Sequence, residues 1–273
     1  MTAVQRSEML LPEPAVGFAA LLGVDFPDVT NGAPLPLLWH WLYLLDRPAT
    51  EDLGPDGHPV RNVIPTPPAP GRRRMFAGGR VEMLGPLRCG EPATRRTEIA
   101  KTVDKHGRSG PMTLVTVRHE ISQRGRLVVH EEQDIVYRSP TPLALPGAED
   151  VAHRADDWHL DTTPPLLFRY SALTYNGHRI HYDRDYARDV EGYPGLVVHG
   201  PLQAMLMTEW VRRNEAAPAR RVEFRLVAPA FDSDGLLVGA DESPGEDARD
   251  VVATSVRTRQ GRRTATALVA LAS

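Results

Sequence analysis

Residues 169–202 read RYSALTYNGHRIHYDRDYARDVEGYPGLVVHGPL, and this stretch holds the densest group of acids, bases and hydrogen-bonding side chains in the chain. Three of the ten histidines lie in it: His178, His181 and His199. Imidazole accepts and donates a proton near neutral pH, so acid–base chemistry is expected here. His178 and His181 lack the HExxH spacing and the cysteine partners typical of metal sites, so we predict no metal.

The end of this stretch, VVHGPL, predicts the start of a long helix. Pro201 has the fixed backbone angle that suits a first helical turn, and apolar residues recur at helical spacing through Pro201–Glu215. The free amide groups at such a start carry the positive end of the helix dipole and can hold a carbonyl oxygen that becomes negatively charged. Gly200 is the best candidate for this donor.

The segments around this helix predict a sheet and two smaller elements. Strands with turns between them are predicted at Arg221–Val227, Leu236–Asp241, Asp250–Thr258 and Thr264–Leu271. On the other side, Pro165–Leu173 is predicted as an edge strand and Asp183–Asp189 as a short helix, which Asp183 is expected to cap.

The first half of the chain shows a similar order. The apolar stretch PLPLLWHWLYLL, within residues 17–46, puts Leu38, Trp41, Leu42 and Leu45 on one helical face, which predicts a buried helix. Trp39, His40 and Trp41 are expected in the core rather than in a site. Four strand-like segments follow: MFAGGRVEML, PLRCGEPATRRTEIAKTVDK, SGPMTLVTVRHEIS and RLVVHEEQDIVYR. A helix followed by an antiparallel sheet, occurring twice, predicts an α+β protein of two similar halves.

A proline-rich segment, Pro140–Pro146, separates the halves. The length of 273 residues suits two domains of ordinary size, so we predict an N-terminal domain over residues 1–145 and a C-terminal domain over residues 146–273.

The composition excludes several kinds of partner. The formal net charge is −3, so the chain lacks the basic field that nucleic acid or anionic membranes need. There is no apolar run long enough to cross a membrane and no signal-like start. Cys89 is the only cysteine, which fits a reducing compartment. We expect a cytoplasmic protein without nucleic-acid or membrane partners.

The segment from Asn176 to Asp183 resembles the active-site motif of the MaoC-like, or R-specific, enoyl-CoA hydratases and dehydratases. That motif runs aspartate, any residue, asparagine, proline, aliphatic, histidine, any residue, aspartate; Ile180, His181 and Asp183 match it. Gly200 falls on the glycine whose amide forms the family's oxyanion hole. The resemblance implies a double hot-dog fold, in which two antiparallel sheets each wrap a helix.

Three positions depart from that motif. Asn176 stands at the catalytic aspartate, and His178 and Arg179 stand at the asparagine–proline pair. An asparagine takes up no proton near neutral pH, so an acid–base scheme that shares work between aspartate and histidine cannot apply unchanged.

A narrower branch matches more of the chain. TYNGHRIHYD and EGYPGLVVHGPL are similar to the two-domain mesaconyl-C4-CoA and itaconyl-CoA hydratases and to the type 2 hydroxyacyl-thioester dehydratases. In the first half LPLLWHWLYLL, LGPDGHP, RRMFAGGRVE and EEQDIVYR also resemble that branch. Its first domain is generally a degenerate hot-dog without the catalytic pair, and coenzyme A enters only as part of the substrate, with no other cofactor.

The resemblance implies roles for individual residues. His181 is expected to be the acid and base, Asn176 to orient the water and the Gly200 amide to hold the thioester oxygen. His178 and His199 either line the site or serve packing, and Tyr175 is expected near the substrate. Arg179 is a candidate partner for a second carboxylate. Arg73, in the run Arg72–Arg74, is expected to contact coenzyme A phosphates or the acyl pocket, or to belong to a solvated cluster.

The implied reaction is hydration of a short branched carboxylated enoyl-CoA, itaconyl-CoA or mesaconyl-C4-CoA, to citramalyl-CoA. The first alternative is a 3-hydroxyacyl-thioester dehydratase of fatty-acid synthesis, which would need a long apolar tunnel. The second is a non-catalytic module that binds acyl thioesters; a hot-dog thioesterase is less favoured because Asn176 replaces the carboxylate base. A monomer and a homodimer are both open.

Overall fold

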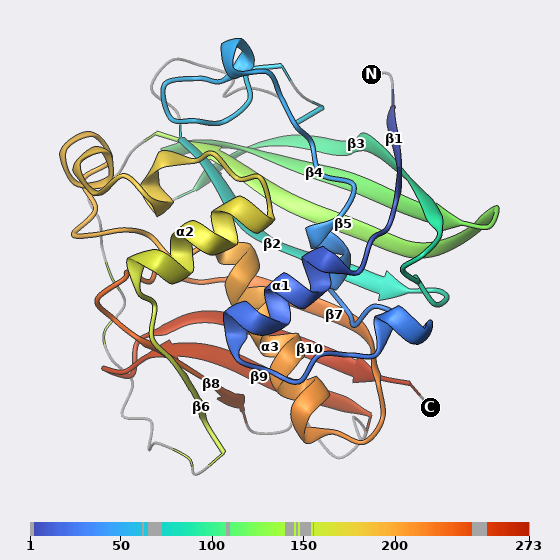
Figure 1. Ribbon diagram of the computed structural model, residues 1–273. Coiled ribbons are helices and arrows are strands. Elements are labelled where there is room, and N and C mark those ends of the chain that lie inside the picture. Colours follow the sequence, from blue (N-terminus) through green and yellow to red (C-terminus); the bar gives the residue numbers. More distant parts are fainter. Residues whose placement is uncertain are drawn as a thin grey trace.

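The computed structural model describes residues 3–61, 63–64, 73–107, 110–139, 145, 147, 154, 156–241 and 250–272. In this part of the chain ten strands form one antiparallel sheet, in the order β1-β3-β4-β5-β2-β7-β10-β9-β8-β6 (Figure 1). The strands are β1 (Val4–Met9), β2 (Arg73–Met83), β3 (Pro92–Gly107), β4 (Gly110–Gln123), β5 (Arg126–Arg138), β6 (Trp158–Leu160), β7 (Ala219–Leu226), β8 (Leu236–Ala240), β9 (Val251–Thr258) and β10 (Arg263–Leu271). The α-helices are α1 (Glu13–Leu22), α2 (Pro164–Leu173) and α3 (Gly200–Asn214).

The two halves of the chain meet at β2 and β7. Five residue pairs join these strands, from Gly78 opposite Arg225 to Glu82 opposite Arg221. A side chain at Gly78 would lie 2.4 Å from the carbonyl oxygen of Phe224 in β7, so glycine is needed where the backbones of the two strands come this close. The predicted pair of sheets is therefore joined edge to edge into one.

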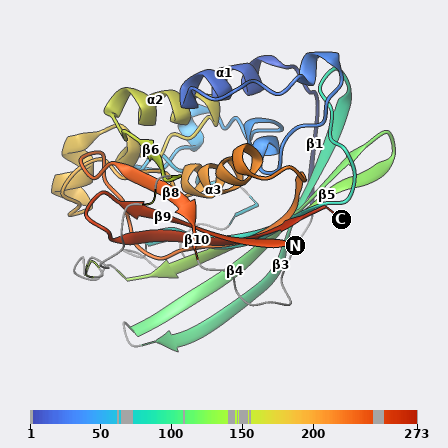
Figure 2. The same cartoon turned by 90° about the horizontal axis from the view of Figure 1, so that it is seen from below.

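The C-terminal half has the predicted helix wrapped by a sheet. Helix α3 packs on β7, β8, β9 and β10, and α1 and α2 cover its other side (Figure 2). Its central residues are buried from Leu202 to Val211. The predicted helix and the four strands after it are confirmed, each with ends within two residues of those expected.

The predicted buried helix in the first half is wrong. The stretch forms only a short 3-10 turn, η2 (Trp39–Leu42), while the first α-helix is α1, further toward the N-terminus. Leu38 and Leu44 on either side of η2 have positive φ angles of 69° and 55°, a left-handed conformation that ends a right-handed helix. The expected burial of Leu38 and Leu42 is confirmed.

The predicted strand Pro165–Leu173 is also wrong, because this segment is helix α2. The Thr163 hydroxyl accepts a hydrogen bond from the Leu166 amide at 3.4 Å, and the prolines occupy the first turn, where they suit a helix. The edge strand is β6, which pairs with β8. The short helix after Asp183 is confirmed as η5 (Tyr186–Val190), and the Asp183 carboxylate accepts from the Tyr186 amide at 3.0 Å.

The four strands predicted in the first half are confirmed as β2 to β5, and β1 was not predicted. The proposed boundary at Pro140–Pro146 falls mostly outside the described residues, so the division into domains stays a prediction. Among the helices of the described residues, none is long and apolar enough to cross a membrane.

Candidate active site

A cavity of about 1220 Å³ is lined by residues from both halves of the chain. The C-terminal half contributes Asn176, His178, His181 and Gly200, and the N-terminal half contributes His40, His58, Arg73 and Arg74. Most of the predicted site residues thus share one cavity with side chains that lie more than a hundred residues away in the sequence.

His181 ends the 3-10 turn η4 (Arg179–His181) and is held in one orientation. Its Nδ1 lies 2.7 Å from the Val197 carbonyl oxygen. A carbonyl only accepts, so Nδ1 carries the proton and Nε2 is left as the basic nitrogen. Burial lowers the pKa of His181 to about 4, although the hydrogen bond to Val197 opposes this shift. At neutral pH the ring is an uncharged base.

His181 lies against the start of helix α3. Its ring stacks on that of His199, with the ring centroids 3.7 Å apart and the planes 19° from parallel. His199 is the residue just before Gly200 and α3 begins at Gly200. His199 is fully buried and its Nε2 lies 2.8 Å from the Ser171 hydroxyl. It does not line the cavity, so of the two alternatives its position favours packing over substrate contact.

Gly200 lines the cavity at the point where α3 begins. The first amides of a helix have no partner within the helix, and they carry the positive end of its dipole. A side chain here would lie 2.2 Å from the tip of Leu226 and 3.5 Å from the Phe76 ring. Glycine is therefore favoured at this position, and the polar group that it can offer to a ligand is its backbone amide.

Asn176 also lines the cavity, as predicted. Its side-chain oxygen accepts a hydrogen bond from the His178 amide at 3.0 Å, which shapes the turn that leads into η4. Because the oxygen is used in this way, the side-chain NH₂ is the group that Asn176 can offer to a water or a substrate.

A loop of the N-terminal half reaches into this site. The Arg179 amide donates to the Asp56 carbonyl oxygen at 2.9 Å, and Gly57, at φ 84°, packs directly on the backbone of Gly177. His58 lines the cavity beside His178, with 3.9 Å between the ring centroids. The LGPDGHP segment that contains Asp56 and His58 was noted only for its resemblance, and this part of the site was missed.

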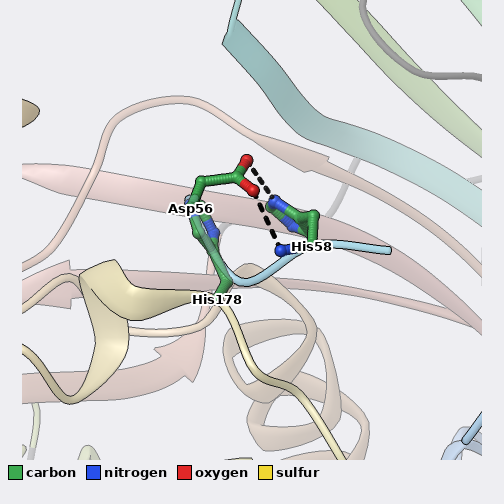
Figure 3. A group of neighbouring side chains, drawn as sticks. All are labelled: Asp56, His58 and His178. Carbon is green, nitrogen blue, oxygen red and sulfur yellow. Dashed lines mark hydrogen bonds and ion pairs between the residues drawn. The ribbon is translucent and has the colours of Figure 1, made fainter. Parts of the chain in front are cut away.

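Asp56 holds His58 by two hydrogen bonds, shown as dashed lines in Figure 3. Its carboxylate oxygens lie 2.9 Å from the His58 Nδ1 and 2.9 Å from the His58 amide. Burial would raise the pKa of Asp56, but the bonds and charge of His58 outweigh it and lower that pKa. Burial lowers the pKa of both His58 and His178.

Asp56, His58 and His178 could together offer three ligand atoms to a metal, since these atoms lie within 4.8 Å of one another. Both Asp56 oxygens already accept a hydrogen bond from His58. The expectation of a metal-free site remains a prediction.

Besides His199, two more predicted substrate-binding residues, Tyr175 and Arg179, do not line the cavity. Tyr175 is 54% exposed. Arg179 forms an ion pair with Asp183 at 2.8 Å, donates to the Pro55 carbonyl oxygen at 3.1 Å and lies over the Tyr186 ring. Its guanidinium is therefore engaged outside the cavity.

Arg73 lines the cavity as expected and pairs with Glu191 at 2.7 Å.

The N-terminal half also contributes a group of polar side chains formed by His40, Trp41 and Glu131. His40 and Trp41 were expected in the core rather than in the site. His40 Nε2 lies 2.8 Å from one oxygen of Glu131, and the Trp41 indole donates to the other at 2.8 Å. Burial would raise the pKa of Glu131, but His40 outweighs it and lowers that pKa to about 2. His40 and Trp41 also line the cavity.

Solved structures share this fold across the whole chain. A MaoC-like dehydratase from Phytophthora capsici covers 99% of this chain and 95% of its own at 16% identity, with a TM-score of 0.71. A Mycobacterium tuberculosis protein described as a double hotdog covers 99% and 95% at 15% identity, with a TM-score of 0.59. The predicted α+β double hot-dog fold is confirmed.

The family model for hydroxyacyl-thioester dehydratase type 2 matches residues 38–232. The chain belongs to this family, and it is a hydro-lyase. A mesaconyl-C(4)-CoA hydratase of Chloroflexus aurantiacus is 48% identical over 80% of this chain and 79% of its own. The mitochondrial type 2 hydroxyacyl-thioester dehydratase of Schizosaccharomyces pombe is 34% identical over 47% of this chain and 45% of its own.

Proposed function

We propose that the protein hydrates a short, carboxylated enoyl-CoA, mesaconyl-C4-CoA or itaconyl-CoA, to citramalyl-CoA. One observation carries the chemistry: an uncharged His181 lies at the start of α3, beside Gly200 in a cavity large enough for an activated acyl group. The mesaconyl-C(4)-CoA hydratase relative supports the choice of substrate.

In the proposed reaction on mesaconyl-C4-CoA, His181 moves the proton. Its Nε2 takes a proton from water while the water oxygen bonds to the β-carbon, and the electron pair of the double bond moves to the thioester oxygen. The Gly200 amide stabilises that oxygen at the helix start. The enolate then takes the proton back from the His181 imidazolium at the α-carbon. Asn176 positions the water through its side-chain NH₂.

The cavity disfavours the dehydratase of fatty-acid synthesis, which needs an apolar tunnel. Its walls include the buried His40–Glu131 pair and two arginines, Arg73 and Arg74. A long alkyl chain against these groups would displace water from them without offering a hydrogen bond in return.

A substrate panel tests the proposal. Purified protein without added cofactor is assayed with mesaconyl-C4-CoA, itaconyl-CoA, crotonyl-CoA and a long-chain 3-hydroxyacyl thioester. We expect the highest kcat/KM with one of the two carboxylated substrates. Fastest turnover of the long-chain substrate would establish the dehydratase instead, and binding without turnover of any would establish a binding module.

Cytoplasmic location and assembly into a homodimer remain parts of this proposal. Strands β1 and β6 are the two edges of the sheet and offer surfaces for pairing between copies. Size-exclusion chromatography with light scattering distinguishes the monomer from the dimer.

A further inference from the structure

Arg74, at the start of β2, places a positive charge in the wall of the cavity. Burial lowers the pKa of its guanidinium, and the group hydrogen-bonds to the Tyr137 hydroxyl. No carboxylate among the described residues forms an ion pair with it, whereas its neighbour Arg73 is paired with Glu191 at 2.7 Å. This half-buried guanidinium is attracted by the charge of Asp56 without forming an ion pair with it, and an anion bound directly to Arg74 would stabilise it further.

Arg74 lines the same cavity as His58, His178 and His181. Burial is the main cause of the lowered pKa values of His58 and His178, and the positive charge of Arg74 lowers both of them further. The His178 ring is 5.4 Å from that of His181. The charge of Arg74 thus acts on two of the histidines that line the cavity together with the proposed base.

The proposed substrates place an anion at this same point. In mesaconyl-C4-CoA and in itaconyl-CoA, the carbon that receives the hydroxyl group carries the free carboxylate directly. A cation that binds this carboxylate must lie beside the catalytic histidine, not at the far end of an acyl tunnel. Arg179, the residue first considered for this role, is engaged outside the cavity by Asp183 and Pro55.

We propose that Arg74 binds the free carboxylate of the substrate and selects a dicarboxylic acyl group over an uncharged one. The planar guanidinium can bind both carboxylate oxygens at once. Such a contact fixes the position of the carboxylate carbon and neutralises the charge of the carboxylate. This inference rests on the proposed hydratase function, because it assigns a residue to the carboxylate of that substrate.

The test compares two substrates that differ only in this group. Mesaconyl-C4-CoA and 3-methylcrotonyl-CoA have the same carbon skeleton, with a carboxylate in the first where the second has a methyl group. We expect Arg74→Gln to lower kcat/KM for mesaconyl-C4-CoA by about 100-fold, since a charged hydrogen-bonded pair is lost. The same variant should change kcat/KM for 3-methylcrotonyl-CoA by less than about threefold, since that substrate does not use the charge.

Arg73→Gln is the matched control. It removes the same charge from the neighbouring position on the cavity wall, where Glu191 already neutralises it. We expect it to leave the ratio of the two kcat/KM values unchanged. The same selective loss in Arg73→Gln, or an equal loss on both substrates in Arg74→Gln, would overturn the inference; the equal loss would point to a contact with coenzyme A.

Two readouts keep the inference separate from the proposed function. If the unmodified protein hydrates neither mesaconyl-C4-CoA nor itaconyl-CoA, the proposed function fails and the inference with it. If it hydrates them and Arg74→Gln keeps the selectivity, only the inference fails. Should Arg74→Gln not fold, as judged by its thermal unfolding, Arg74→Lys takes its place; it keeps the charge but not the bidentate contact, and an intermediate loss of selectivity is expected.

Discussion

His181 combines two properties that make it a base at neutral pH. Its Nδ1 donates to the Val197 carbonyl oxygen, which leaves Nε2 to accept a proton, and burial keeps the ring uncharged. Burial by the surrounding protein lowers the pKa of His181, so a histidine exposed to solvent would titrate at a higher pH.

This arrangement predicts a characteristic pH profile. Only the unprotonated ring can accept a proton, and the pKa of His181 is lowered to about 4, so kcat/KM for hydration should stay level from pH 8 down to pH 5 and fall below that. Initial rates measured across this range provide the check. A fall with a midpoint near pH 6.5 would show that the catalytic group titrates at the ordinary value for histidine.

At the residue scale, local motifs predicted part of the site. His181, Asn176 and Gly200 lie within 25 residues of one another in the sequence, and the cavity brings all three together. His58 could not be predicted in this way, because its place in the site depends on a loop docked across the halves. Arg74 belongs to the run Arg72–Arg74 that was considered for the acyl pocket, and pairing between β2 and β7 joins the half that contains it to the half that contains His181.

At the scale of elements, the docked loop joins the halves beside the site. A side chain at Gly57 would lie 1.9 Å from the Gly177 carbonyl oxygen, and the Arg179 amide donates to the Asp56 carbonyl oxygen. The loop therefore sets the position of His58 against His178 through backbone contacts.

Gly57→Ala should disturb the site more than the fold. Alanine at φ 84° costs about 1–2 kcal/mol for its left-handed backbone, and the clash with Gly177 pushes the loop away from His178. We expect kcat/KM to fall by about tenfold or more. Gly32→Ala is the control, because Gly32 has a φ of 88° and nothing within 4 Å of the added carbon. Equal activity in the two variants would contradict a role for loop docking.

Secondary structure was predicted correctly where a single hydrophobic periodicity determines the element. It was predicted wrongly where prolines or tertiary contacts override that periodicity. Helix α3 and strands β7 to β10 follow their periodicity. The stretch around η2 has helical spacing, but its Leu38 and Leu44 take left-handed angles while His40 and Trp41 turn to Glu131. The segment of α2 was predicted as an edge strand, although its prolines mark the first turn of a helix.

At the scale of the whole molecule, buried histidines make stability depend on pH. Burial lowers the pKa of five histidines in the folded state: His58, His119, His178, His181 and His199. The unfolded chain takes up protons near pH 6.5, where the folded chain does not. Stability therefore rises with pH, by about 1.4 kcal/mol per pH unit for each proton of difference.

We expect the free energy of unfolding to be lower at pH 5.5 than at pH 7.5. Urea unfolding followed by tryptophan fluorescence at the two pH values measures this difference. A comparison of pH 7.5 with pH 8.5, where histidines are unprotonated in both states, should show little change. Equal stability at pH 5.5 and pH 7.5 would show that these histidines are not kept uncharged by the fold.

Turnover of mesaconyl-C4-CoA by His181→Ala decides whether His181 is the base. We expect a loss in kcat of about 100-fold or more, with thermal unfolding close to that of the unmodified protein, because the group that takes the proton from water is gone. Undiminished turnover by a folded His181→Ala variant would show that another group moves the proton.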